Sequence, residues 1–144
     1  MRGIPEGLTC HSPGPCLSRA AELHVSALPL AVPQARRHAR SVLGGWGLRH
    51  LSPVAELVIS ELVTNAIAAH SALPGPSLVG LRIEAHADAV IVMVADASPA
   101  EPVLVPPDDA APGGRGLHIV SAIAADWGFI RHDRGKTVWA AITP

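Results

Sequence analysis

The stretch SELVTNA, residues 60–66, places Glu61 and Asn65 four positions apart within an apolar segment. Positions i and i+4 of an α-helix lie one above the other on the same face. At about 100° per residue, the positions within roughly 60° of Glu61 include Asn65 and the apolar residues Val54, Leu57, Val58 and Ala68. A buried polar group without a partner costs about 1–3 kcal/mol. The pattern therefore predicts a central buried helix in which a further group satisfies both polar side chains.

The composition indicates one domain with an aliphatic core. The sequence has 144 residues, of which 49% are hydrophobic, with one Phe and no Tyr, and this length suits a single core. The formal net charge of −1 argues against direct binding to nucleic acid. We see no run of about 18 apolar residues that would span a bilayer, and no apolar middle region of a secretion signal. A cytoplasmic protein without membrane contact is expected.

The N-terminal segment, residues 1–21, is expected to be a flexible leader, with the folded domain at residues 22–144. The leader is rich in Pro and Gly and contains Cys10, His11 and Cys16. Zinc sites need four ligands at closer paired spacings, and these are the only two cysteines in the sequence. We therefore expect free thiols in a reducing compartment.

The domain is expected to begin with a strand and a helix. Residues 23–30 have strand character, and Pro29 favours an edge position because proline cannot donate to a ladder. Pro33 suits the first turn of a helix that Gly44 and Gly45 end. A basic cluster lies mostly away from the apolar stripe of this helix: Arg36, Arg37, His38 and Arg40. It is either a solvated helix face or a docking surface for an acidic partner.

The helix that contains SELVTNA is expected to begin at Ser52 and to end near His70. Ser52 is a candidate N-cap, and Pro53 suits the first helical position. Glu56 is placed to interact favourably with the positive end of the helix dipole. Because this helix is apolar almost all round, it should be the central one.

The second half of the domain reads as strands around one short helix. Residues 78–86 and 89–96 predict two strands, the first with alternating apolar and polar positions. The stretch 99–112 contains five prolines and reads as a lid or insert. A helix follows at about 115–125, and a closing hairpin turns around Gly135. This order predicts an α+β fold, with helices on one face of a mixed or antiparallel sheet.

Three further groups of residues could carry chemistry. Asp96 ends a buried strand, where an ionised carboxylate needs a donor. The run GGRG, residues 113–116, precedes a helix, where backbone N–H groups form a natural anion site. Gly135, Lys136 and Thr137 begin the last strand, without the upstream glycine spacing of a P-loop. Taken singly, these could be a strand-end cap, a flexible turn and a hairpin turn.

In this order, SELVTNA, Asp96, GGRGL and GKTVWA resemble the GHKL ATPase superfamily. Within it, the chain is similar to the small anti-sigma-factor serine/threonine kinases of bacterial partner-switching systems. The resemblance covers residues 22–143. It implies a Bergerat-type ATP-binding sandwich, with three helices packed on one face of a mixed, mainly antiparallel sheet.

The resemblance also implies roles for individual residues. Asn65 would bind a Mg²⁺ ion that bridges the ATP phosphates, and Glu61 would be the catalytic residue that accepts a proton from the attacking hydroxyl or orients it. Asp96 would accept a hydrogen bond from the adenine amino group, with Thr137 near the same pocket. The lysine before it, Lys136, is a weaker candidate for this pocket, because its side chain could simply leave the sheet. The remaining cofactor-binding residues would lie at the phosphates and just beyond: Gly113, Gly114, Arg115, Gly116 and Leu117. The proline-rich stretch would be a mobile lid over the nucleotide.

The chain departs from the superfamily pattern at the phosphates. The family often has a basic residue three positions after the asparagine and a histidine four after it, where this chain has Ala68 and Ala69, with His70 one position later. The loop after Asp96 also lacks the usual glycine. Two hypotheses remain open, a kinase and a nucleotide-dependent binding module that has lost catalysis. A histidine-kinase catalytic domain ranks last, because no helical dimerisation segment with a phospho-accepting histidine precedes residue 22.

By resemblance, the protein would transfer the γ-phosphoryl group of ATP to a serine of an antagonist protein and so control a transcription regulator. Its partners would be an anti-sigma-factor antagonist, a sigma factor, or both. Whether it forms a homodimer is left open.

Overall fold

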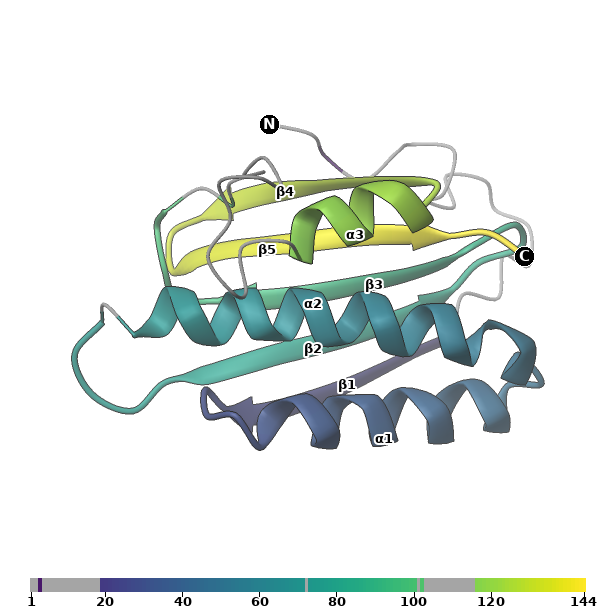
Figure 1. Ribbon diagram of the computed structural model, residues 1–144, viewed down its shortest axis with the longest axis horizontal. Helices are drawn as coiled ribbons and strands as arrows, with labels where there is room; N and C mark the ends of the chain where they lie inside the picture. The colour runs from purple at the N-terminus through teal and green to yellow at the C-terminus, as the bar shows by residue number, and fades with distance from the viewer. Residues whose placement is uncertain (1–2, 4–18, 72, 101, 103–115) are drawn as a thin grey trace.

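The computed structural model describes residues 3, 19–71, 73–100, 102 and 116–144. Their elements run along the chain in this order (Figure 1): β1 (Arg19–Ser26), α1 (Ala31–Gly45), the short 3-10 helix η2 (Arg49–Leu51), α2 (Ser52–His70), β2 (Leu78–Ala85), β3 (Val90–Asp96), α3 (Gly116–Ile123), β4 (Asp126–His132) and β5 (Gly135–Ile142). The expected leader up to residue 18, apart from Gly3, lies outside the described residues, and so do Cys10 and Cys16.

The strands form one open antiparallel sheet in the order β1-β2-β3-β5-β4. Three α-helices cover one face of this sheet: α1 on the β1 side, α2 across the middle, and α3 over β4 and β5 (Figure 1). The expected α+β fold is confirmed. Every strand pairing in the described part of the chain is antiparallel. Of the two expected kinds of sheet, mixed or antiparallel, the antiparallel one is therefore observed.

The main core lies between the helices and the sheet. The alternation of β2 buries Leu81 and Ile83 toward the helices, as side chains of period two require. β3 is buried along nearly its whole length because residues on both its faces pack. On the other face of the sheet, Ile91, Met93 and Trp139 form a second, smaller buried cluster. Burial on both faces explains why β3 lacks a polar alternation.

The first strand confirms the expected edge position but differs in its bounds. β1 spans Arg19–Ser26 rather than residues 23–30, so its first residues precede the expected domain boundary at residue 22. It pairs with β2 from Arg19↔Ala85 to Ser26↔Leu78. Pro29 lies beyond the strand, so the reason given for the edge position was wrong. Pairing with the full length of β2 sets these limits.

The N-terminus of α2 also differs from expectation. Leu51 is its N-cap residue and Ser52 already has helical geometry, while Pro53 occupies the first turn as expected. The Ser52 hydroxyl donates to Glu56 Oε2 at 2.8 Å instead of accepting from a backbone N–H as an N-cap would, and Glu56 Oε1 accepts from Arg40 at 2.5 Å. The hydrogen bond from Arg40, assisted by Ser52 and by nearby positive charge, lowers the pKa of Glu56 despite burial. Glu56 therefore joins α2 to α1.

The stretch that contains SELVTNA is helical, as predicted, but the predicted burial of the helix face around Glu61 was wrong. Val54 and Leu57 are exposed at 36% and 43%, and Ala68 is exposed as well. Glu61 and Asn65 are half-buried on the same flank. Of the four predicted neighbours only Val58 packs, and the face that packs consists of Ala55, Val58, Ile59, Leu62, Val63 and Ala66. The two polar side chains therefore stand at the edge of the core rather than inside it.

The segment Arg49–His70 has a mean hydropathy of 1.3 over its most apolar window and is long enough to cross a membrane. The sequence expectation of no such stretch was therefore too strict. In this fold the segment is the central helix, packed against β3 and flanked by α1 and α3, and core helices of soluble domains meet the same criterion.

Candidate functional site

A cavity of about 300 Å³ lies among α2, the end of β3, the start of β5 and the first turn of α3. This is the lower end of the range of about 300–1,000 Å³ for small-molecule sites. Its walls are mostly aliphatic, with three polar side chains among them: Asn65, Asp96 and Lys136. An apolar cavity with a few convergent polar groups is the usual form of a ligand site.

Asp96 supplies the acceptor of this cavity. It ends β3 and is only 5% exposed. Its Oδ1 accepts a hydrogen bond from Ser98 N at 2.8 Å, within the loop that follows the strand. Among the described residues, no hydrogen bond is made to the other carboxylate oxygen, Oδ2. Asp96 therefore keeps an acceptor for a bound group.

Lys136 lies against Asp96, which sequence reasoning did not predict. Asp96 and Lys136 are partners in the β3–β5 register. The lysine is 4% exposed, and its Nζ donates to Asp96 Oδ1 at 3.0 Å. The alternative in which this side chain leaves the sheet is not the one observed. A buried carboxylate needs a nearby charge or donor, and the cross-strand position provides one.

Gly135 allows the strands that carry Asp96 and Lys136 to approach closely. Its φ of +142° is unfavourable for residues with a side chain, and a Cβ built there would lie 2.0 Å from the backbone oxygen of Asp96. The absence of a side chain lets β5 begin directly against the end of β3. The glycine is therefore a requirement of the site as well as of the hairpin turn.

The two residues of the opening motif have different places. Asn65 lines the cavity on α2. Glu61 stands one turn earlier on the same flank, half-buried, and is not part of the cavity wall. Neither side chain forms a hydrogen bond within the part of the chain that the structure describes. Both remain available to a ligand or a second protein.

His70 supports the site from outside the cavity, a role that sequence reasoning did not give it. It is 6% exposed at the end of α2, and its Nε2 accepts a hydrogen bond from Ala97 N at 2.8 Å. The bond connects the helix that carries Asn65 to the residue after Asp96. Its position one residue later than in the family pattern was the available signal.

The remaining predicted site residues divide into three groups. Leu117 lines the cavity from α3, which begins at Gly116. Thr137 does not line it: it lies on the other face of β5, where its Oγ1 is 3.2 Å from His132 Nε2. Gly113, Gly114 and Arg115 lie outside the described residues, as does the expected lid except for residues 99, 100 and 102.

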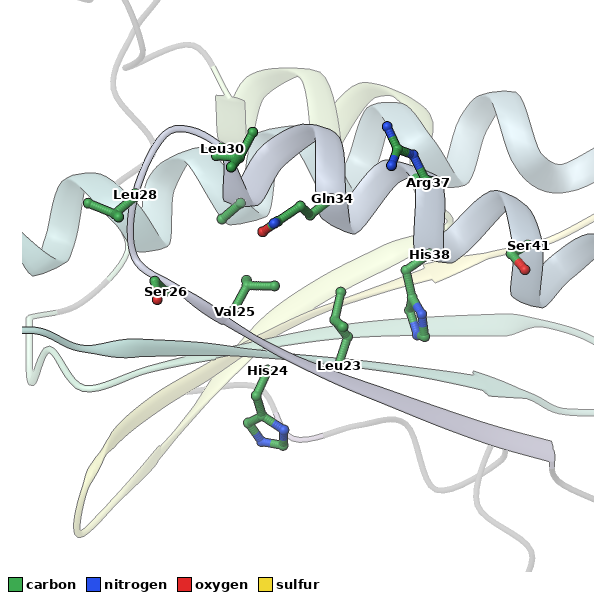
Figure 2. Close-up of a pocket in the computed structure, with 11 residues that line it drawn as sticks. Leu23, His24, Val25, Ser26, Leu28, Leu30, Gln34, Arg37, His38 and Ser41 are labelled. Carbon is green, nitrogen blue, oxygen red and sulfur yellow. The ribbon is translucent and has the colours of Figure 1, made fainter.

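A larger cavity of about 730 Å³ lies elsewhere, between β1 and α1 (Figure 2). Leu28 and Leu30 stand at its edge, exposed at 61% and 64%, and α1 contributes Arg37 and His38. Burial lowers the pKa of His38. This open groove contains none of the predicted nucleotide-site residues, so size alone does not locate the site. A docking role for the basic cluster, one of the two alternatives left open by the sequence, stays a prediction.

An α+β sandwich with one helical layer and an acceptor carboxylate at the end of a central strand is the architecture expected of a nucleotide-binding domain. Comparison with family models gives a match to the histidine kinase-like ATPase domain over residues 25–142. The chain belongs to this family, which is part of the GHKL superfamily, and an ATPase domain implies binding of ATP. No curated protein matches the chain.

Proposed function

We propose that the protein is an ATP-dependent serine/threonine kinase that regulates transcription by partner switching. The observation that carries the proposal is the convergence of Asn65 and Asp96, from two separate elements, on one cavity of about 300 Å³. Glu61 stands one turn from Asn65 on the same flank of α2. In this arrangement a nucleotide would be held at Asp96 and its phosphates would extend toward the helix flank.

The polar groups of the cavity fit a purine nucleotide. Asp96 Oδ2 has no hydrogen bond from the described residues and can accept one from the adenine amino group. The apolar walls supplied by Leu62, Val94 and Val138 suit the faces of the base. When bound, ATP would supply the phosphoryl group, together with a Mg²⁺ ion that neutralises developing charge. Asn65 has the side-chain oxygen that such an ion accepts as a ligand.

Glu61 is the proposed general base. A serine hydroxyl of the partner would enter at the open flank of α2, and its proton would pass to the Glu61 carboxylate as the phosphoryl group is transferred. The products are a phosphoserine and ADP. The half-buried position of Glu61, one turn from Asn65 and outside the cavity wall, supports this role, because the side chain is accessible to a partner.

A nucleotide-dependent binding module is the second candidate. Ala68 and Ala69 line the cavity at positions where the family often has a basic residue and a histidine. Their short side chains add no positive charge at the phosphates, which would weaken transition-state stabilisation. In this alternative, the protein would bind a partner according to its nucleotide state without phosphorylating it.

The proposed partners are an anti-sigma-factor antagonist that offers a serine and a sigma factor that competes for overlapping surface. We place the protein in the cytoplasm, where both would be found, acting without direct contact to nucleic acid or membrane. A homodimer is compatible with this proposal.

The test is incubation of the protein with γ-labelled ATP, Mg²⁺ and antagonist proteins encoded by neighbouring genes. The kinase proposal predicts label on a serine of one antagonist, and no label when Glu61→Ala replaces the wild type. Nucleotide-dependent binding of an antagonist without any transferred label would favour the binding module. Failure to bind nucleotide at all would contradict both.

A further inference from the structure

Lys136 has a hydrogen-bonding capacity that its observed contacts do not use. An ammonium group has three N–H donors and no acceptor. One donates to Asp96 Oδ1 at 3.0 Å, and a second reaches Ser98 O at 3.4 Å, beyond the usual range of such bonds. Among the described residues no third acceptor contacts Nζ. The side chain is nevertheless 4% exposed and lines the cavity. A buried N–H donor of Lys136 that has no acceptor among the described residues points to a bound ligand.

Asp96 offers the complementary group at the same wall. Its Oδ1 already receives Ser98 N and Lys136 Nζ, while no described donor reaches Oδ2. The β3–β5 register holds the two residues opposite each other, and Gly135 allows the close approach. The cavity therefore presents one acceptor and one donor side by side, held by adjacent strands rather than by a loop.

Neutralisation of Asp96 alone is the simpler role for this lysine. This role would require only the contact to Oδ1, and nucleotide affinity would not depend on a contact with Lys136. Lys136 lies in the cavity wall beside Val138, which favours a direct contact with the ligand as well. A side chain that serves only the carboxylate has no need to line the space where a base would lie.

We propose that Asp96 and Lys136 together read the edge of adenine, and that Lys136 determines base specificity. This inference rests on the proposed nucleotide binding. The 6-amino group of adenine would donate to Asp96 Oδ2, and the neighbouring ring nitrogen N1 would accept from Lys136 Nζ. Guanine presents the opposite order, with an acceptor at position 6 and an N–H donor at position 1. With Asp96 at position 6 and Lys136 at position 1, a guanine would meet two mismatched groups.

Adenine analogues that lack N1 should bind this cavity more weakly. In 1-deaza-ADP a C–H group replaces N1, so the acceptor for Lys136 is lost while the amino group for Asp96 is kept. A charged donor without its acceptor in a buried site is expected to weaken binding by about ten- to a hundredfold. GDP should bind at least as weakly, because both contacts are mismatched.

The experiment is a calorimetric titration of the full chain, with Mg²⁺ present, using ADP, 1-deaza-ADP and GDP. The wild type should prefer ADP to 1-deaza-ADP by about tenfold or more. The preference should vanish in Lys136→Met and partly return in Lys136→Gln, whose amide keeps an N–H donor. Arg134→Met is the matched control, because it removes an exposed positive charge from the adjacent turn, and it should keep the full preference.

The wild-type comparison needs no variant, so a folding defect at Lys136 does not decide the outcome. Equal affinity of the wild type for ADP and 1-deaza-ADP would overturn the role of Lys136 and leave nucleotide binding intact. Tighter binding of GDP than of ADP would overturn the assigned order of donor and acceptor. Absence of binding to every nucleotide would overturn this inference together with the proposed function.

Discussion

His70 Nε2 accepts a hydrogen bond from Ala97 N at 2.8 Å and so connects the end of α2 to the loop after β3. Because Nε2 accepts, the ring is in the form that carries its proton on Nδ1. The contact fixes the position of Asn65 relative to Asp96, since it joins the two elements that carry them.

Replacement of this histidine should therefore affect both stability and binding. His70→Ala leaves the Ala97 N–H without its acceptor and removes a buried ring, which should lower the free energy of unfolding by about 1–3 kcal/mol. Nucleotide affinity should fall as the loop after Asp96 loses its support. Urea denaturation and calorimetry measure the two effects. His50→Ala, at an exposed position in η2, is the control and should change neither; equal behaviour of the two variants would remove the role given to His70.

Gly135 should tolerate no side chain. In Gly135→Ala the added Cβ would meet the backbone oxygen of Asp96 at 2.0 Å, at a φ of +142°. Strain of this kind costs on the order of 1–3 kcal/mol, and the Asp96–Lys136 contact should be displaced. Gly45→Ala is the matched control, because a Cβ there meets nothing within 4 Å. Thermal unfolding should separate the two variants, and equal midpoints would show that the approach of β5 to β3 is not restrictive.

The contact between α1 and α2 should make stability depend on pH. The hydrogen bond from Arg40, together with that from Ser52, lowers the pKa of Glu56 in the folded state. A lowered carboxyl pKa contributes stability above the unfolded value of about 4.3, and this contribution is lost as the pH falls below it. Below about pH 4.5, the wild type should therefore lose unfolding free energy more steeply than Glu56→Gln. Parallel curves from urea denaturation at each pH would contradict this.

Glu61 and Asn65 should separate catalysis from metal-dependent binding. Glu61→Ala should bind Mg²⁺ and nucleotide as the wild type does and lose phosphoryl transfer, because the carboxylate acts on the attacking hydroxyl. Asn65→Ala should lose the part of nucleotide affinity that depends on Mg²⁺. Titrations with and without the metal, paired with single-turnover transfer, distinguish the two. Loss of nucleotide binding in Glu61→Ala would place Glu61 in the binding site rather than in catalysis.

Periodicity in the sequence predicted most of the fold. The strict alternation of β2 and the long apolar run of α2 each had one satisfactory interpretation, and both elements are observed. The local signal at Ser52 was misleading because the helix begins one residue earlier, and the hydroxyl donates to Glu56 instead of accepting from a backbone N–H. The extent of β1 depends on pairing with β2, which no local pattern in β1 records.

The site was less predictable because it depends on strand register. Asp96 and Asn65 were placed by motif, and both line the cavity. Lys136 and Thr137 are adjacent in a strand, so only one of them can face the helices. The β3–β5 register turns Lys136 to the cavity and Thr137 away from it. Sequence alone could not decide between the two, since either side chain is compatible with a strand at that position.

Calorimetric titration of Mg-ADP into wild type and Asp96→Ala measures whether the cavity at Asp96 binds a nucleotide. Loss of the carboxylate removes a charged acceptor worth about 1.5–3 kcal/mol. Asp96→Asn is tested as well because it keeps the size of the side chain, so that a folding defect caused by the unpaired Lys136 in Asp96→Ala does not decide the result. We expect the wild type to bind Mg-ADP and the affinity of both variants to be lower by about tenfold or more. Unchanged affinity in folded Asp96→Asn and Asp96→Ala would show that the nucleotide does not bind at Asp96.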